Sequence, residues 1–354
     1  MHTAVGIAGA LLIWVILWDA FATIVMPRTV SFFRPSTYFY HGSWRLWTWL
    51  ASLVRDLYRR QNFYAIFGPL SVPLLLGFWA LGLIFGFAMM HWGFDTKIFS
   101  EETGRWGFGT MVYLSGTTFF TLGLGDFTAV NSLGRLFIVL EAATGFVSLA
   151  IIVGYVPLLD QVFSQREARI TLFGLRTGTP QCAVRLLEGY GKAEERGKLE
   201  AILHDSEQWI AEFLQNHISH PVLAYYRSQH FGQSWLTSLT AFLDTCALLQ
   251  LPIDHPLRSQ VKTSFRMALY ALVEMARVLK VRPDRKSPDR LGPEDFEKIR
   301  EALEKVGLFF PAGPEAEKSL TELRHLYEPF ALAVSKRLKI PLPVWVPSPA
   351  SEGP

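Results

Sequence analysis

One stretch of the chain, TTFFTLGLGDFT from Thr117 to Thr128, has a composition suited to binding a cation with its backbone. Glycine alternates with leucine at Gly123 and Gly125, and such a pattern favours neither a helix nor a regular strand. Without a Cβ, these positions can adopt backbone angles that let consecutive carbonyl groups point the same way. A column of carbonyl oxygens can replace the water shell of a cation. The elements around the stretch must then place it inside a membrane.

The composition divides the chain into an apolar part and a charged part. Half of the 354 residues are hydrophobic, the mean hydropathy is +0.22, and the apolar excess lies almost wholly before residue 165. This predicts a membrane part followed by a soluble part. The formal net charge of +3, without a basic arm, does not favour a nucleic-acid partner. Cys182 and Cys246 suit a reduced compartment rather than a disulfide framework.

Three segments are long and apolar enough to cross a bilayer, which takes roughly 20 helical residues. They lie at 5–26, within 63–92 and at 136–159. The first is expected to be retained, because it lacks the basic leader and the cleavage site of a secretory signal. In the second, the GxxxG spacing of Gly82 and Gly86 predicts close helix packing.

Basic residues near the ends of the spans predict the orientation. Six arginines follow the first span, only Lys97 and Arg105 follow the second, and three arginines follow the third before residue 177. The positive-inside rule puts the N-terminus outside and the C-terminal half in the cytoplasm. The basic segment SWRLWTWLASLVRDLYRR, 43–60, has near-helical apolar spacing, which predicts a helix in the inner interface; a loop with membrane-anchoring tryptophans is the alternative.

The apolar piece before the glycines is too short to cross. A helix over 107–120 would be roughly 20 Å long and reach only part way through the bilayer. Five extended residues after it would return over about 16 Å. Non-helical backbone at that depth must line a cavity or be buried in protein. We therefore expect a re-entrant loop in which the carbonyls from Thr121 to Leu124 face an aqueous path, with the electronegative end of the short helix pointing at them.

The residues TLGLGD, 121–126, resemble the TVGYGD selectivity filter of potassium channels. The segment 63–164 resembles the two-helix pore domain of that superfamily, with a pore helix before the filter and Gly134 and Arg135 opening the inner helix. The wider pattern resembles a group of bacterial potassium-channel-like proteins. These have an extra N-terminal span ending in a stretch like WDAFATIVMPR and a soluble tail with a run like HPVLAYYRSQHFGQSW.

The resemblance implies four copies around one pore and a role for each residue of the filter region. Potassium would be held by the carbonyls of Thr121, Leu122, Gly123 and Leu124, with Gly125 completing the filter. Asp126, Thr117 and Thr118 would support the filter, and Gly145 would be a gating hinge, with close packing against the pore helix as the alternative. Leu124 replaces the aromatic residue that braces related filters, so a non-selective cation channel is an alternative hypothesis. A non-conducting, membrane-anchored sensor or scaffold is the alternative from another class.

Two acids lie inside the predicted spans, where charge is costly and acids usually face protein or water. Asp19 is expected either to lock a neighbouring helix or the cytoplasmic mouth, or to reach headgroups or a nearby arginine. Glu141 is expected to form a buried hydrogen bond to the back of the pore helix; the alternative is a charge that tunes the permeation path.

The second half has the 3.6-residue periodicity of helices at 198–217, 234–251, 259–281 and 292–308. A second GYG at 189–191 lies among charged residues and is expected to be a turn. His217, His220 and His230 do not share a helix face, because Pro221 interrupts it, so a metal site is not expected. No GxGxxG follows a strand, which argues against a nucleotide-binding fold. This half is expected to be an assembly or regulatory domain.

The sequence thus predicts an all-α membrane protein with three transmembrane helices and a re-entrant pore loop, followed by a helical cytoplasmic domain. The expected parts are an N-terminal transmembrane helix (1–27), a basic interfacial segment (28–62), a pore domain (63–164), a helical cytoplasmic domain (165–342) and a flexible tail (343–354). The expected function is potassium-preferring conduction by a homotetramer in the bacterial inner membrane. The permeant K⁺ and the lipid bilayer are the expected partners, with neither enzymatic activity nor a cofactor.

Overall fold

The computed structural model describes residues 2–26, 33–100, 107–178, 180–230, 232–251, 256–285, 289–309 and 314–346. The described chain is largely helical, with a short antiparallel ladder in which Ile98–Phe99 (β1) pairs with Thr128–Ala129 (β2). The chain divides into two compact units, Met1–Gln161 and Val162–Pro354. The predicted fold class, an all-α membrane protein with a helical C-terminal region, is confirmed.

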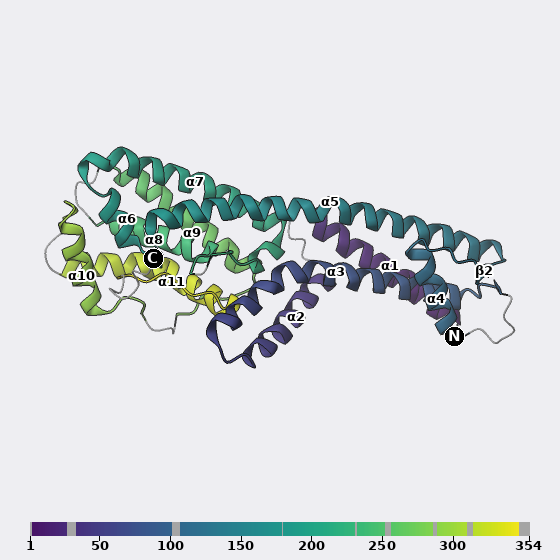
Figure 1. Ribbon diagram of the computed structural model, residues 1–354. Helices are drawn as coiled ribbons and strands as arrows, with labels where there is room; N and C mark the ends of the chain where they lie inside the picture. The colour runs from purple at the N-terminus through teal and green to yellow at the C-terminus, as the bar shows by residue number, and fades with distance from the viewer. Residues whose placement is uncertain are drawn as a thin grey trace. The chain divides into compact units, whose positions relative to one another are not determined.

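The first unit contains α1 (His2–Ile24), α2 (Pro35–Ser52), α3 (Leu57–Gly93), α4 (Phe108–Phe119) and the greater part of α5 (Ser132–Thr177). Figure 1 shows α1 running beside α3, and α4 as a short helix next to α3. Helices α1, α3 and α5 are long and apolar enough to cross a membrane, which agrees with the three predicted spans. The short helix α4 ends immediately before the glycine-rich stretch.

Helices α1 and α3 approach each other closely at small residues. A Cβ added to Gly9 would lie 2.5 Å from the carbonyl oxygen of Gly86, and one added to Gly93 would lie 2.1 Å from the backbone nitrogen of Gly6. Neither position therefore accommodates a larger residue without a backbone shift. The prediction of close packing from the GxxxG spacing is confirmed at Gly86, because small residues let helix backbones come together in a membrane.

The basic segment after α1 forms a helix, but its bounds differ from the prediction. Helix α2 ends at Ser52, and α3 begins at Leu57, because the Asp56 side chain caps α3 by accepting a hydrogen bond from the Arg59 backbone N–H at 2.7 Å. The loop alternative is therefore wrong. Two tryptophans of α2 pack on α3: the Trp47 ring stacks on Phe63 with centroids 4.4 Å apart, and the Trp44 ring lies edge-on to Phe67 at 4.8 Å.

Asp19 joins α1 to both neighbouring helices. Its fully buried carboxylate accepts hydrogen bonds from the Ser36 backbone N–H at 2.9 Å, the Ser36 hydroxyl at 2.8 Å and the Trp79 indole N–H at 2.9 Å. The Arg34 guanidinium lies 4.0 Å away and supplies positive charge. Four groups from α2, α3 and the segment before α2 thus compensate one acid. The predicted lock on neighbouring helices is confirmed, and the nearby arginine of the other alternative is also present, as Arg34.

Replacing Asp19 by alanine is expected to lower the stability of the first unit. Two hydrogen-bond donors on Ser36 and one on Trp79 would lose their acceptor, at a cost of about 3 kcal/mol or more. The Asp19→Asn variant keeps one acceptor oxygen and should lose less. Thermal unfolding of the full chain in detergent measures the effect, and an unchanged melting temperature for Asp19→Ala would contradict the lock.

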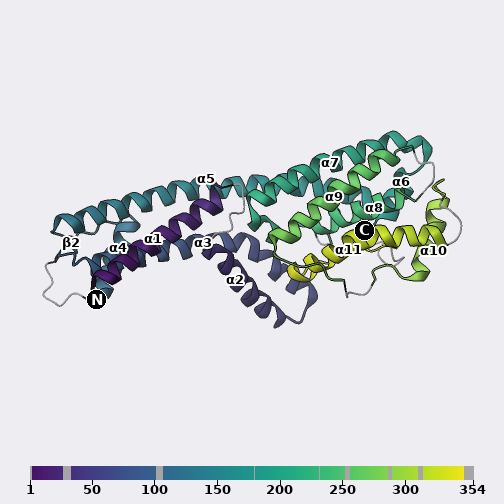
Figure 2. The same ribbon diagram turned by 180° about the vertical axis from the view of Figure 1, so that it is seen from behind.

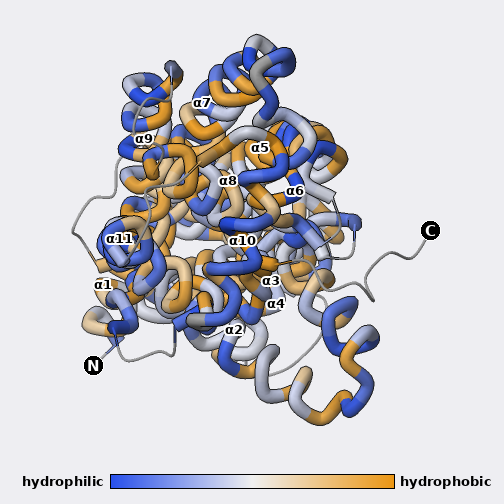
Figure 3. Tube along the Cα trace, turned by 90° about the vertical axis from the view of Figure 1, so that its left-hand side faces the viewer, coloured by the Kyte–Doolittle hydropathy of each residue, from blue (hydrophilic) through white to orange (hydrophobic). Residues whose placement is uncertain are grey.

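The second unit is a helical domain (Figure 2), and its described residues comprise the end of α5 and six further α-helices. They are α6 (Ala183–Tyr190), α7 (Arg196–Ser219), α8 (Trp235–Leu249), α9 (Arg258–Val278), α10 (Pro293–Glu304) and α11 (Pro314–Leu338), with short 3₁₀ turns at Ala193–Glu195 (η1) and Pro221–Tyr225 (η2). Helix α8 is its centre, since every residue of it is buried and it packs against α6, α9 and α11. Hydrophilic residues predominate on α10 (Figure 3).

The four helices predicted in this half are confirmed as α7, α8, α9 and α10, whereas α6 and α11 were not predicted. The second GYG is not a turn, because Gly189 and Tyr190 end α6 and Gly191 follows in a helical conformation. Residues 343–346 of the expected tail are held against the domain: Trp345 is buried, and the guanidinium groups of Arg290 and Arg324 lie 5.4 and 5.5 Å from the centre of its ring. The rest of the expected tail lies outside the described residues.

Candidate functional site

The glycine-rich stretch after α4 has an alternating backbone conformation. Thr121, Gly123 and Gly125 have positive φ angles of 54°, 55° and 81°, and the two leucines between them do not. Alternation between left-handed and ordinary backbone angles turns successive carbonyl groups toward the same side. A β-branched residue rarely adopts a positive φ, so Thr121 is a strained position of the kind found at functional sites.

The stretch is tied to the end of the short helix by its backbone. The Leu122 N–H donates to the Thr117 carbonyl at 2.8 Å, and the Thr121 N–H donates to the Thr118 carbonyl at 2.9 Å. Thr117 and Thr118 thus support the stretch through main-chain carbonyls; the Thr117 hydroxyl donates to the Leu114 carbonyl instead. The electronegative end of α4 lies directly next to the expected ion-binding backbone.

At the other end of the stretch, Asp126 is held by a tyrosine of α4. The Tyr113 hydroxyl donates to one Asp126 carboxylate oxygen at 2.8 Å, and the Phe127 backbone N–H donates to the other at 3.1 Å. Asp126 therefore braces the stretch against α4. The sequence analysis missed Tyr113. The signal that could have identified it is a tyrosine on the short helix before the glycine-rich stretch.

The stretch is open on one side within a single chain. Leu122 and Leu124 are 60% and 62% exposed, and a Cβ added to Gly123 or Gly125 would meet no atom within 4 Å. Leu124 consequently does not pack against α4 as a brace within its own chain.

Gly145 of α5 packs against the end of α4. A Cβ at this position would lie 2.0 Å from the Phe119 carbonyl oxygen and 2.9 Å from its carbonyl carbon. Phe119 is the last residue of α4, two residues before Thr121. Gly145 thus permits close contact between α5 and the end of α4, as the close-packing alternative predicts. Its role as a gating hinge stays a prediction.

Glu141, one helical turn before Gly145, faces the back of α4 and not the open side of the stretch. Its carboxylate is fully buried, lies 3.6 Å from His91 Nε2 on α3 and is next to the Ser115 hydroxyl on α4. This placement favours a polar contact behind the short helix over a charge in an ion path. The sequence analysis placed Glu141 against the short helix but did not identify Ser115 or His91 as its neighbours.

Residues 74–157 match a protein-family model described as "Ion channel". This segment is similar to ion channels. The match begins within α3 and includes α4, the glycine-rich stretch and α5 as far as Pro157. No curated protein and no solved structure matches the chain. The family match and the three long apolar helices support a membrane protein that takes part in ion transport.

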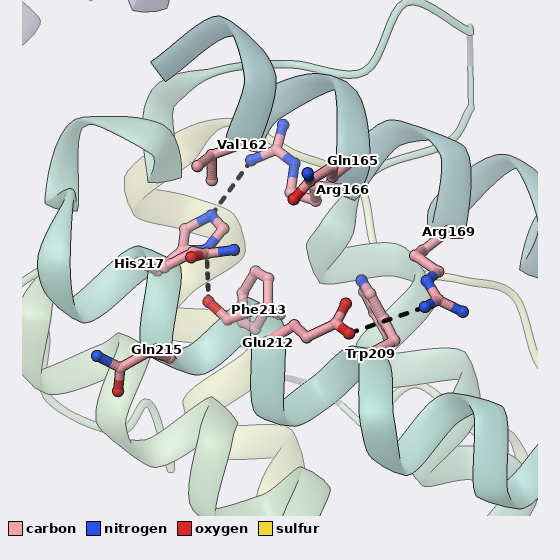
Figure 4. A pocket seen from close by; sticks show the side chains of 10 residues that line it. Val162, Gln165, Arg166, Arg169, Trp209, Glu212, Phe213, Gln215 and His217 are labelled. Carbon is pink, nitrogen blue, oxygen red and sulfur yellow. Dashed lines mark hydrogen bonds and ion pairs between the residues drawn. The ribbon is translucent and has the colours of Figure 1, made fainter. Parts of the chain in front are cut away.

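The second unit has a cavity of about 460 Å³ between the end of α5 and α7 (Figure 4). Arg166, buried at its wall, donates hydrogen bonds to the carbonyls of Leu223 and Tyr226 at 2.8 Å each and to His217 Nε2 at 3.2 Å. Because arginine only donates, His217 Nε2 accepts and its Nδ1 donates to the Phe213 carbonyl at 2.8 Å. Among the described residues, no group of three or more His, Cys, Asp or Glu side chains could hold a metal ion.

The stability of this unit is expected to fall at acidic pH through His217. Burial, and then the charge of Arg166, hold the pKa of His217 well below its ordinary value of 6.5. Below pH 6.5 the unfolded chain binds a proton that the folded unit does not. The free energy of unfolding therefore falls by up to about 1.4 kcal/mol for each pH unit. Urea unfolding of the full chain at pH 7 and pH 5 should show a loss for the wild type that is smaller in His217→Gln. Equal losses of unfolding free energy in the wild type and in His217→Gln would contradict a role for His217 in this pH dependence.

Proposed function

We propose that the chain is a potassium-preferring ion channel whose filter is TLGLGD, Thr121 to Asp126. The observation that carries the proposal is the alternation of positive φ angles at Thr121, Gly123 and Gly125 within the segment that is similar to ion channels. Four carbonyls, those of Thr121 to Leu124, would dehydrate and coordinate K⁺, with the Thr121 hydroxyl at the inner end. The channel would conduct passively and without enzymatic chemistry.

Assembly as a homotetramer is part of the proposal. One strand of carbonyls cannot surround an ion, and rotational symmetry supplies the other strands. The open side of the stretch, with Leu122 and Leu124 exposed, leaves room for the neighbouring copies. We expect native mass measurement in nanodiscs to give four chains. A stable monomer or dimer as the sole species would reject the pore.

A channel of the bacterial inner membrane, with the N-terminus outside and the second unit in the cytoplasm, is the proposed location. It rests on the arginines that follow the first and third spans. Protease protection of the two chain ends in oriented vesicles tests it.

A non-selective cation channel is the second candidate, and one observation favours it. Leu124 stands where related filters carry an aromatic brace, and its side chain is 62% exposed in the single chain. A filter without that brace would discriminate less between K⁺ and Na⁺. The ratio of the two ion permeabilities separates the candidates, whereas intact tetramers without flux under any condition would favour a scaffold.

A further inference from the structure

Three buried polar side chains, one from each of α3, α4 and α5, meet behind α4. His91, Ser115 and Glu141 are fully buried. His91 Nε2 lies 3.6 Å from a Glu141 carboxylate oxygen, and the Ser115 hydroxyl lies next to the same carboxylate. Polar groups at membrane depth are costly unless hydrogen bonds satisfy them. The cluster therefore needs an explanation beyond packing.

The contacts within the cluster centre on the Glu141 carboxylate. A separation of 3.6 Å is too long for a hydrogen bond. Within the described part of the chain, His91 Nε2 and the Ser115 hydroxyl both approach the Glu141 carboxylate, outside strict hydrogen-bond geometry but close enough to interact with it. A carboxylate can accept hydrogen bonds from both an imidazole N–H and a hydroxyl, so Glu141 is the group that links His91 of α3 to Ser115 of α4.

His91 is fixed from the other side, so that its free ring nitrogen faces Glu141. Its Nδ1 is hydrogen-bonded to the Thr96 hydroxyl at 2.9 Å, and the Thr96 backbone N–H donates to the His91 carbonyl at 2.9 Å. The Phe137 ring packs edge-on against the imidazole, with centroids 5.6 Å apart. The orientation of the imidazole is therefore set by the segment after α3, through Thr96, and by α5, through Phe137.

The cluster lies close to the backbone that supports the filter. Ser115 precedes Thr117 by two residues, and the Thr117 carbonyl accepts the hydrogen bond from Leu122. We propose that His91, Glu141 and Ser115 are positioning residues that hold α4, and with it the filter, in the ion-binding conformation. The inference rests on the proposed function, since it requires 121–125 to be the filter.

Ion selectivity in liposomes tests the positioning role. Ser115→Ala and Glu141→Ala are each expected to lower the ratio of K⁺ to Na⁺ flux about tenfold, the factor that about 1.4 kcal/mol produces. Glu141→Gln should keep most of the ratio, because an amide still donates and accepts hydrogen bonds. Ser71→Ala is the matched control: Ser71 is equally buried, but its hydroxyl donates to the Gly68 carbonyl of its own helix at 2.7 Å.

Hydrogen exchange of the backbone amides at 115–119 in nanodiscs gives a second readout that does not depend on conduction. We expect about tenfold faster exchange in Ser115→Ala and Glu141→Ala, the factor that about 1.4 kcal/mol produces, and no change in Ser71→Ala. Exchange and selectivity both as in the wild type would overturn the inference. A wild type that does not discriminate K⁺ from Na⁺ would reject the proposed function alone, since exchange would still decide the role of the cluster. Ser115→Ala removes a single oxygen atom and serves as the test if Glu141→Ala fails to assemble.

Discussion

Gly123→Ala is expected to abolish potassium flux. Gly123 has a φ of +55°, and a left-handed conformation costs an L-residue about 1–2 kcal/mol. In a tetramer this cost arises four times around one pore. Alanine would relieve it by rotating the peptide groups on either side, and the carbonyls of Leu122 and Gly123 would then turn away from the ion. Flux into liposomes loaded to give a potassium gradient is the measurement.

The second GYG of the chain supplies a matched control for this substitution. Gly189 has no positive φ, ends a helix of the second unit, and would place an added Cβ in open space. Gly189→Ala should therefore conduct as the wild type does. If Gly123→Ala also conducted normally, the assignment of the filter would be wrong.

Gly145→Ala is expected to reduce both flux and the thermal stability of the assembly. The new methyl group would lie 2.0 Å from the Phe119 carbonyl oxygen, far inside a van der Waals contact, so α4 must move away from α5. Overpacking of this kind costs about 1–3 kcal/mol at each site. Because Phe119 ends α4 next to the filter, we expect flux to fall by at least about tenfold, the factor that 1.4 kcal/mol produces.

Gly154→Ala on the same helix is the control for Gly145. An added Cβ there meets no atom of its own chain within 4 Å, and alanine favours a helix over glycine by about 1 kcal/mol. A Gly145→Ala variant with altered gating but wild-type thermal stability would show that this glycine is a hinge and not a packing contact.

The spans and the filter backbone were predictable because their signals are local. Apolar length alone identifies α1, α3 and α5, and alternating glycines predict the unusual backbone angles of 121–125. The start of α3 also has a local signal, since Asp56 is a helix-capping residue. The apolar spacing continues across Asp56, however, so the sequence analysis predicted one helix where α2 ends and α3 begins.

The partners of the buried polar groups could not be predicted. Which side chain meets Glu141 depends on the rotation of α3 and α4 about their axes, and local periodicity does not fix that rotation. Helix α11 was missed for a related reason. It contains Pro329, and its charged residues Arg324 and Glu328 pair with each other in the interior, so charge on this helix does not mark an exposed face.

The most direct test of the account is flux into liposomes containing the purified full chain. A potassium gradient, a sodium gradient and a gradient of a large organic cation would be applied in turn. The account predicts flux that is greatest for potassium, much smaller for sodium and undetectable for the organic cation. Equal flux of potassium and sodium would contradict the proposed selectivity, and passage of the organic cation would contradict a pore lined by the carbonyls of Thr121 to Leu124.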